Sequence, residues 1–318
     1  MLSDSLRMDG FREAINKMVG RGDVVLDAGT GTGIMAIMAV QAGAEKVYAV
    51  EKRGILEVAK NLARENGCAD RVHFVGGDVR RIELPERVDG VVCEMLGYSG
   101  LSEGIREVMA IAKEKHLKPG GWMIPVETSV FLVPVQDEGL YRKIMLDEEA
   151  LKVSLESLRD ELSHNFWVEG LRDSVFLSEP QITEKIDFRI GDGGGRGVEE
   201  NEFAIAGGGK LHGLGCWFTA ALAPDVILTT APDNLPTHWS QVFFPLRKPM
   251  SVEAGDRLLV RFESFPVGGG EMFYWRVELR DGGGVKGRCV QSNALTFSCL
   301  ADRKESFPPS LSETFRLK

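Results

Sequence analysis

The chain has 318 residues, 43% of them hydrophobic, which is enough to bury a full core and leads us to expect two domains. Its formal net charge of −9 argues against general binding of nucleic acid through a basic surface, although many soluble enzymes are equally acidic for solubility alone. The five cysteines are widely scattered and form no CxxC pair, so neither a disulfide framework nor a metal site is expected.

The sequence contains no apolar stretch long enough for a membrane-spanning helix, and its first residues lack the basic and apolar regions of a signal peptide. We therefore expect a soluble, cytoplasmic protein without a membrane partner. The nucleus is an alternative location in a eukaryotic cell.

Helical and strand patterns alternate through residues 1–125. The expected elements are one or two helices within 1–20, a strand at 24–26, a helix at 34–41, a strand at 46–50, a helix at 55–66, strands at 72–75 and 88–93, a helix at 102–116 and, after a turn at 118–121, a strand ending at Pro125. This rhythm is typical of a parallel sheet with crossover helices, and it predicts a doubly wound, Rossmann-like α/β domain.

Residues 126–318 have a different sequence pattern, in which apolar runs alternate with glycine clusters. We expect a charged helical insert near 147–163, strands at 215–221, 226–230, 239–244, 257–263, 272–279 and 294–298, and hairpin loops at the glycine clusters 191–197, 206–209, 267–270 and 281–284. A β-sandwich or β-barrel beginning near residue 126 is the simplest interpretation.

A glycine-rich loop stands between the first predicted strand and the helix that follows it. Its glycines are Gly29, Gly31 and Gly33, and glycines there permit a tight turn and close approach of the backbone to a ligand. The spacing from Gly31 to Ala36 also fits the GxGxxA pattern of dinucleotide-binding loops, so the glycines alone do not separate S-adenosylmethionine (SAM) from NAD.

Carboxylates near this loop favour SAM. Asp27 would repel a pyrophosphate but can accept hydrogen bonds from an amino acid's ammonium group, and Glu51 at the end of the second strand can accept both ribose hydroxyls. After the third strand, Asp78 is the candidate to meet the adenine amino group, with Val79 beside it. The alternative for Asp78 is a turn aspartate that bonds its own backbone.

Two glutamates, Glu94 and Glu103, flank a short loop after the fourth strand. Such a pair is often merely solvated, but open α/β sheets bind ligands at this edge. Two carboxylates about 6 Å apart would repel each other by roughly 3 kcal/mol at an effective dielectric of 20, so a cation between them is favoured. A planar guanidinium, which binds carboxylates through paired hydrogen bonds, fits this requirement.

Several motifs occur in the order found in the protein arginine methyltransferases, which this chain resembles across both predicted domains, apart from a poorly matched interval at about 139–213. The motifs are MLSDSLR at 1–7, VLDAGTGTGI at 25–34, VYAVE at 47–51, EMLGYSGLSE at 94–103, Thr-His-Trp at 237–239 and AGD at 254–256. Without the glutamate pair, the Thr-His-Trp segment would be interpreted as a core patch with a satisfied histidine.

The resemblance implies in-line transfer of the SAM methyl group to a guanidino nitrogen of an arginine in a protein or peptide. Glu94 and Glu103 would orient the acceptor and offset the repulsion between two cations. The resemblance further implies that His238 pairs with Asp4, that Arg7 holds the SAM carboxylate, and that Tyr98 and Trp239 bind substrate. Arg7 has the alternative of pairing with a local acid on its helix.

Departures from the family pattern concern both cofactor and product. The aromatic Tyr-Phe-x-x-Tyr helix that precedes the first motif in the family is not in the sequence, an acid of the family is replaced by Arg80, and a methionine linked to product type is Leu96 here. The family also implies a homodimer, with the dimerisation arm at about 165–187.

Two other function classes stay open from the sequence. One is SAM-dependent methylation of a different acceptor, which would have no obvious need for two facing carboxylates. The other is a binding protein that keeps the fold without the chemistry, or a nicotinamide enzyme.

Overall fold

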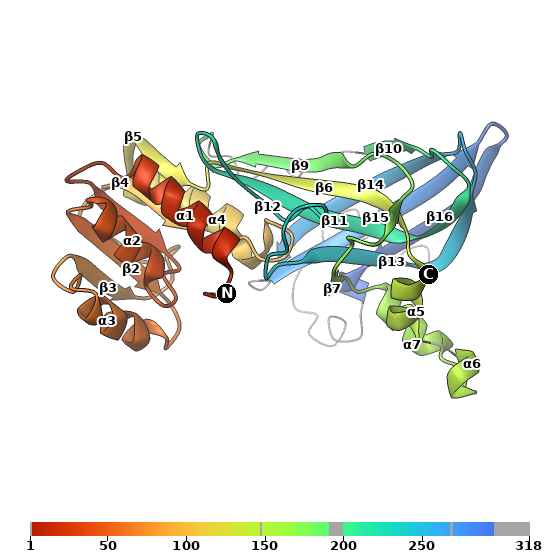
Figure 1. Cartoon of the computed structure of the whole chain (residues 1–318), viewed down its shortest axis with the longest axis horizontal. Coiled ribbons are helices and arrows are strands. Elements are labelled where there is room, and N and C mark those ends of the chain that lie inside the picture. Colours follow the sequence, from red (N-terminus) through yellow and green to blue (C-terminus); the bar gives the residue numbers. More distant parts are fainter. Residues whose placement is uncertain (1, 147, 191–199, 268–269, 296–318) are drawn as a thin grey trace. The chain divides into compact units, whose positions relative to one another are not determined.

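The computed structural model describes residues 2–146, 148–190, 200–267 and 270–295, and the chain divides into two compact units (Figure 1). Among the described residues, the first unit comprises 2–129, 185–190 and 218–239, and the second comprises 130–184, 200–217 and 240–295. The first break lies close to the predicted boundary after residue 125. Two later segments, however, return to the first unit, so a single cut does not separate the units.

The first unit is built on a parallel five-stranded sheet with the order β3-β2-β1-β4-β5, as the sequence predicts for a doubly wound fold. Its strands are β1 (Val24–Ala28), β2 (Lys46–Glu51), β3 (Val72–Gly76), β4 (Val88–Cys93) and β5 (Leu117–Ile124). The strand order reverses between β1 and β4. Ligands of such sheets bind at the carboxyl ends of the strands near this reversal.

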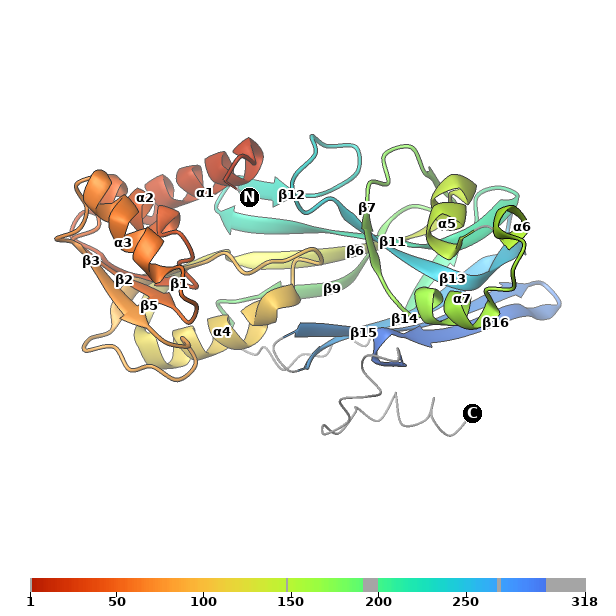
Figure 2. The ribbon, with the colours of Figure 1, turned by 90° about the horizontal axis from the view of Figure 1, so that it is seen from below.

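Helices cover both faces of the parallel sheet. Figure 2 shows the first three helices on one face and the fourth on the other. They are α1 (Ser5–Met18), α2 (Ile34–Ala42), α3 (Leu56–Glu65) and α4 (Ile105–Ile111), the last extended by the short turns η1 (Ser102–Gly104) and η2 (Ala112–His116). Residues 35–40 of helix α2 are all buried, which explains why the helix carries apolar residues on every side. No described helix is long and apolar enough to cross a membrane.

The turn predicted at 118–121 lies within β5 and does not precede it. Val88 pairs with Leu117, whereas Gly90 pairs with Trp122, so β5 carries extra residues at this point. The surplus chain is accommodated around Gly120, which has a φ of +78°. The turn residues were identified correctly, but they form an irregularity in a strand.

Beyond residue 126 the chain forms mainly antiparallel strands. One sheet has the order β7-β13-β11-β6-β8, with β12 paired to β11 and β9 paired to β6, and the other has the order β10-β14-β15-β16. The strands are β6 (Glu127–Gln136), β7 (Trp167–Glu169), β8 (Val175–Phe176), β9 (Gln181–Asp187), β10 (Glu200–Ala204), β11 (Gly209–Ala223), β12 (Val226–Thr229), β13 (Gln241–Val252), β14 (Arg257–Val267), β15 (Gly270–Asp281) and β16 (Gly284–Ser292). Strands β6, β9 and β11 contribute residues to both units.

An aromatic cluster joins the two sheets of the second unit face to face. The ring of Phe244 on β13 lies 5.2 Å from Phe262, 5.3 Å from Phe273 and 5.0 Å from Trp275, all on the four-stranded sheet. All four rings are at most 3% exposed. Complete burial of such a side chain contributes on the order of 2 kcal/mol, so this cluster is the core of the predicted sandwich.

Several predictions for this part of the chain were wrong in their bounds, among them the strand predicted at 215–221, which extends from Gly209 to Ala223. Helices begin earlier than the predicted insert at 147–163, because α5 (Glu138–Met145) precedes α6 (Glu148–Leu151) and α7 (Glu156–Ser163). The strand predicted at 239–244 begins at Gln241 and continues to Val252. Ala294 belongs to the turn η3 (Asn293–Leu295) and not to a strand, while 296–298 lie outside the described residues.

Strands β6 to β10 and β16 were missed, and the glycine clusters had different outcomes. The cluster at 281–284 forms the predicted hairpin, since Asp281 pairs with Gly284, and the cluster at 206–209 leads into β11. The cluster at 191–197 and residues 268–269 lie outside the described residues.

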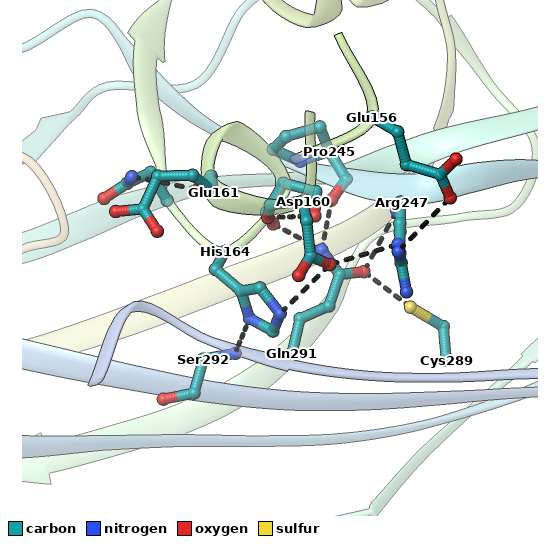
Figure 3. A network of polar contacts seen from close by, with 11 residues as sticks. Glu156, Asp160, Glu161, His164, Pro245, Arg247, Cys289, Gln291 and Ser292 are labelled. Carbon is teal, nitrogen blue, oxygen red and sulfur yellow. Dashed lines mark hydrogen bonds and ion pairs between the residues drawn. The ribbon is translucent and has the colours of Figure 1, made fainter. Parts of the chain in front are cut away.

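Polar contacts bind α7 to the strands of the second unit (Figure 3). The Gln291 amide donates to the carbonyl of Ser163, at the end of α7, and to that of Pro245 on β13 at 3.0 Å. The backbone N–H of Ser292 donates to Nδ1 of His164 at 3.1 Å. Because Gln291 and His164 are buried, these bonds satisfy polar groups that would otherwise destabilise the fold.

Candidate active site

The polar residues predicted for the site lie at the carboxyl ends of the parallel strands. Asp27 is on β1, Glu51 is the last residue of β2, and Glu94 directly follows β4. The segment that carries Asp78 follows β3, and the Gly77 N–H at its start donates to the carbonyl of Glu51 at 3.0 Å. The fold therefore gathers residues that are up to 67 positions apart in the sequence at one edge of one sheet.

The glycine loop after β1 is held by its own backbone. The N–H groups of Gly29 and Thr30 donate to the carbonyl of Val50, at 3.0 and 2.9 Å. Gly29 has a φ of +79°, and a Cβ atom there would lie only 3.0 Å from the sulfur of Met95. Any larger residue would be strained and would press on the acidic loop, so glycine is needed at this position.

Asp27 is completely buried beneath this loop. The hydroxyl of Thr30 donates to its carboxylate, as does the backbone N–H of Ala36. Burial nevertheless raises the pKa of Asp27 to about 6, because a carboxylate loses more hydration than these hydrogen bonds restore. A cationic ligand group near Asp27 would stabilise its ionised form.

Glu51 contacts the glycine loop directly. One oxygen of its carboxylate accepts the N–H of Gly31 at 3.1 Å, and the other accepts the N–H of Arg53 at 2.8 Å. These two bonds fix the carboxylate while leaving each oxygen with a further acceptor direction. The remaining directions suit a ligand with paired hydroxyl groups.

Asp78 is bound by Arg80 from its own loop. Its Oδ1 atom accepts the Arg80 backbone N–H at 3.0 Å and the Nε–H at 2.9 Å, and Oδ2 accepts an Nη2–H at 2.5 Å. The side-chain hydrogen bonds from Arg80 hold the pKa of Asp78 well below its usual value. Val79, between the two, is buried.

Glu94 forms a buried ion pair with Arg7 of helix α1. Their side chains are only 8% and 6% exposed, and Arg7 Nη2 donates to Glu94 Oε2. Burial raises the pKa of Glu94 to about 7, although Arg7 opposes that shift. The ionised carboxylate of Glu94 is unfavourable in this buried environment unless a cation lies beside it, and Arg7 is that cation.

Glu103, the other predicted carboxylate, lies in a different environment. It is exposed and has a φ of +61°, in the left-handed region that non-glycine residues rarely adopt. The negative charge of Glu103 still acts on Glu94, because it contributes to the raised pKa of Glu94. A Cβ atom added at Gly97 would lie 3.4 Å from its Cγ atom, which places Glu103 against the start of the same loop.

The pair expected between Asp4 and His238 is present. Asp4 Oδ2 lies 2.8 Å from His238 Nδ1 and also accepts the His238 backbone N–H at 2.8 Å, while Oδ1 accepts the N–H of Arg7 at 3.0 Å. Burial alone would raise the pKa of Asp4, but these hydrogen bonds hold it below its usual value. Asp4 thus caps α1 and ties the Thr-His-Trp segment to that helix.

The two predicted substrate residues differ in exposure. Tyr98 is 44% exposed on the acidic loop, whereas Trp239 is only 2% exposed. The Trp239 ring packs edge-on against Phe218 and lies 5.9 Å from the Arg7 guanidinium. Trp239 therefore supports Arg7 from beneath, a role that the sequence did not indicate.

Two contacts of the site were missed from the sequence. The ion pair of Arg7 with Glu94 joins residues 87 positions apart, and the packing of Met95 on Gly29 joins the acidic and glycine loops. Neither has a local signal, because opposite charges and apolar residues are common along the whole chain. The Arg7 Nε–H is buried and has no hydrogen-bond partner among the described residues, so it is available to an anionic ligand group.

The chain is similar in sequence to known methyltransferases. Two family models match, one described as a methyltransferase domain over residues 25–121 and one as the arginine methyltransferase oligomerization subdomain over residues 127–267. Protein arginine N-methyltransferase 6 of Xenopus laevis is 30% identical over 280 residues, covering 80% of this chain and 78% of the relative. Protein arginine N-methyltransferase PRMT10 of Oryza sativa is 32% identical over 305 residues, covering 82% and 78%.

A solved structure shares the fold. The structure of the Trypanosoma brucei PRMT1 enzyme–prozyme heterotetrameric complex with AdoHcy has a TM-score of 0.81 and covers 92% of this chain and 95% of that chain. Its sequence identity is 24%, so the likeness supports the architecture and no finer feature.

Proposed function

The chain belongs to the protein arginine N-methyltransferase family of SAM-dependent enzymes, and we propose that Glu94 and Glu103 hold the guanidinium group that receives the methyl group. One observation carries this assignment. The buried carboxylate of Glu94 already binds a guanidinium, that of Arg7. Its surroundings therefore accept the same chemical group that a substrate arginine would present.

Charge explains why two glutamates are needed. The sulfonium of SAM and the guanidinium of the substrate are both cations, so their encounter is unfavourable without nearby negative charge. Glu94 is shielded from water and interacts strongly with a cation, while Glu103 adds a second charge from the exposed end of the loop. Together they would orient the acceptor nitrogen and draw positive charge away from it during the transfer.

The residues at the strand ends fit the cofactor. SAM supplies the electrophilic methyl group, and the related Trypanosoma brucei structure holds the demethylated product AdoHcy. Asp27 would stand near the ammonium group, Glu51 would accept the ribose hydroxyls, and Asp78 with Val79 would meet the adenine. The unpartnered Nε–H of Arg7 suits the SAM carboxylate, so that Arg7 would bridge this anion and Glu94.

The cap of the first helix and the Thr-His-Trp segment hold Arg7 in place. Asp4 accepts its backbone N–H, and Trp239 packs beneath its guanidinium. His238 completes this support through its contact with Asp4, and its half-buried ring is also placed to carry a proton away from the site. Tyr98, on the exposed part of the acidic loop, would contact the peptide that carries the arginine.

Mass spectrometry of arginine-rich peptides incubated with the protein and SAM tests this function. We expect mass increases of one or more methyl groups on arginine, and their loss with a Glu94→Gln variant that calorimetry shows to bind SAM still. SAM binding without any arginine methylation, or methylation that survives in a folded Glu94→Gln variant, would contradict the assignment of the acidic loop.

A homodimer is the proposed assembly, since the match to the oligomerization subdomain spans residues 127–267. The described residues of the predicted arm, 165–187, form β7 to β9 and carry three exposed apolar side chains. Three more are exposed on the preceding helical segment. The six are Leu151, Val153, Leu158, Val168, Val175 and Ile182, which are 38–55% exposed.

Light scattering tests the assembly. Twice the subunit mass is expected for the parent chain, and a single-subunit mass for the double variant Leu151→Glu/Val153→Glu. Val285→Glu, a change at a valine of β16 that is 52% exposed and lies outside residues 127–267, is the control and should stay dimeric. A parent chain with the mass of one subunit would contradict the proposal.

A cytoplasmic location is proposed from the cysteines. The described cysteines Cys68, Cys93, Cys216 and Cys289 are all free thiols, as expected in a reducing compartment. Cell fractionation would test this, and recovery only with secreted proteins would contradict it.

A further inference from the structure

Arg80 binds Asp78 within the loop that follows β3. Arg80 gives Asp78 three hydrogen bonds, two to Oδ1 and one to Oδ2. An ionised carboxylate can accept about four hydrogen bonds, so these three bonds leave one acceptor direction open on Oδ2. The paired, planar contact also fixes the plane of the carboxylate, which a lysine could not do.

Arg80 is itself anchored to the helix that follows the acidic loop. Its Nη1 atom lies 2.7 Å from a carboxylate oxygen of Glu107 in the first turn of α4. The far end of the same helical segment also contacts this loop, because His116 forms a hydrogen bond with the backbone of Val79. His116 is 2% exposed, so this second contact is shielded from water.

From these contacts we propose that Arg80 is a positioning and specificity residue: it orients Asp78 so that its open oxygen selects a cofactor with a 6-amino purine. The inference rests on the proposed function, since it presumes that SAM is bound at the strand ends. Its chemistry is simple. An exocyclic amino group can donate to Asp78, whereas the 6-oxo group of a deaminated purine is an acceptor and would face the same carboxylate with repulsion.

The contacts at Glu107 and His116 lie on the helical segment that follows the acidic loop. Helix α4 begins immediately after η1, which contains Glu103, and the helical segment contacts the adenine loop at Glu107 and at His116. The loop that carries Asp78 is therefore bound to the same helical segment that begins with Glu103. The Glu107 contact should contribute less than the Asp78 contact, because the Glu107 side chain is 52% exposed and Asp78 only 20%.

Calorimetric titration of the full chain with two ligands tests the proposal. The ligands are S-adenosylhomocysteine and its 6-oxo analogue S-inosylhomocysteine, which differ only at the purine edge. We expect the parent chain to prefer the amino form about 10-fold, the value for one hydrogen bond to a charged group. Arg80→Ala should reduce this preference to about 3-fold or less, and Arg80→Lys should fall between the two.

Arg81→Ala is the matched control, because it removes the same charge from an exposed neighbour on the same loop. It should keep the parent preference, and thermal melting should show that both alanine variants are folded. The preference between two ligands does not change if Arg80 only stabilises the loop.

The outcomes separate the inference from the function on which it rests. An unchanged preference in Arg80→Ala, or equal binding of both ligands by the parent chain, would overturn the role of Arg80 while leaving cofactor binding intact. Failure of the parent chain to bind either ligand would overturn the proposed function as well.

Discussion

The two ends of the acidic loop carry the same residue type in opposite environments. Glu94 is buried, paired with Arg7 and has a pKa raised to about 7 by burial. Glu103 is exposed and has left-handed backbone geometry. Glu94 is therefore part of the folded core of the site, whereas Glu103 stays in water at the cost of backbone strain.

Replacing Glu94 should lower the free energy of unfolding far more than replacing Glu103, and this is the largest expected difference between the two ends of the loop. Glu94→Leu removes the partner of a buried guanidinium, and an uncompensated buried charge costs about 3–5 kcal/mol. Glu103→Leu removes an exposed side chain and should change the free energy of unfolding by no more than about 0.5 kcal/mol. Urea denaturation of the two variants gives both values, and equal losses would contradict the contrast in burial.

Catalysis should depend on both ends, but unequally. Glu94→Gln keeps the shape and removes the charge, and it should lower kcat by about 100- to 1000-fold, the loss typical of an electrostatic group at a reacting centre. Glu103→Gln should lose less, because water screens its charge. Initial rates of methyl transfer to an arginine peptide compare the two. A fully active Glu94→Gln enzyme would show that the buried glutamate is structural only.

The pH dependence of activity should follow Glu94. Its carboxylate must be ionised to bind a guanidinium, so kcat/KM of the parent chain should rise with pH up to about 7 and then level off. Glu103→Gln should keep this rise. A rate that is flat between pH 5.5 and about 7 would contradict the raised pKa of Glu94.

Stability should change with pH in the opposite sense. Because the pKa of Glu94 rises from 4.5 to about 7 on folding, the folded chain binds more protons than the unfolded chain between these values. The free energy of unfolding should therefore fall as pH rises through this window and stay constant above it. Asp27, with a pKa of about 6, adds a smaller fall that persists in Glu94→Gln, so denaturation at several pH values separates the two contributions.

The smallest effect concerns the strained end of the loop. Glycine adopts a φ of +61° without the steric cost that a side chain has there, so Glu103→Gly should raise the free energy of unfolding by up to about 1 kcal/mol. The same change should lower methyl transfer, since the carboxylate is lost. A variant that is less stable than the parent chain would show that Glu103 makes stabilising contacts.

How much could be predicted from the sequence differs between the two units for a physical reason. In the first unit, buried parallel strands and amphipathic helices give long, distinct patterns, and β2 and β4 were predicted to within one residue. In the second unit, β7 has three residues and β8 has two, which is too short for a periodic pattern. Strand β13 was predicted only to Phe244, because its second half is partly exposed and contains charged residues.

The site was predictable in part. The glycine loop and the acids at the strand ends follow local motifs, and so their positions were expected. The contact of Asp4 with His238 was expected only from resemblance, and the pairing of Arg7 with Glu94 was not expected at all. Contacts between residues far apart in the sequence depend on how helix α1 packs, and no local pattern encodes that.

We propose that the acidic loop recognises the charge of a guanidinium. Calorimetry with the chain saturated by S-adenosylhomocysteine can compare an arginine peptide with the same peptide containing citrulline, which keeps the shape but carries no charge. We expect at least about 10-fold tighter binding of the arginine peptide, and loss of that preference in Glu94→Gln. Equal affinities for the two peptides in the parent chain would contradict it.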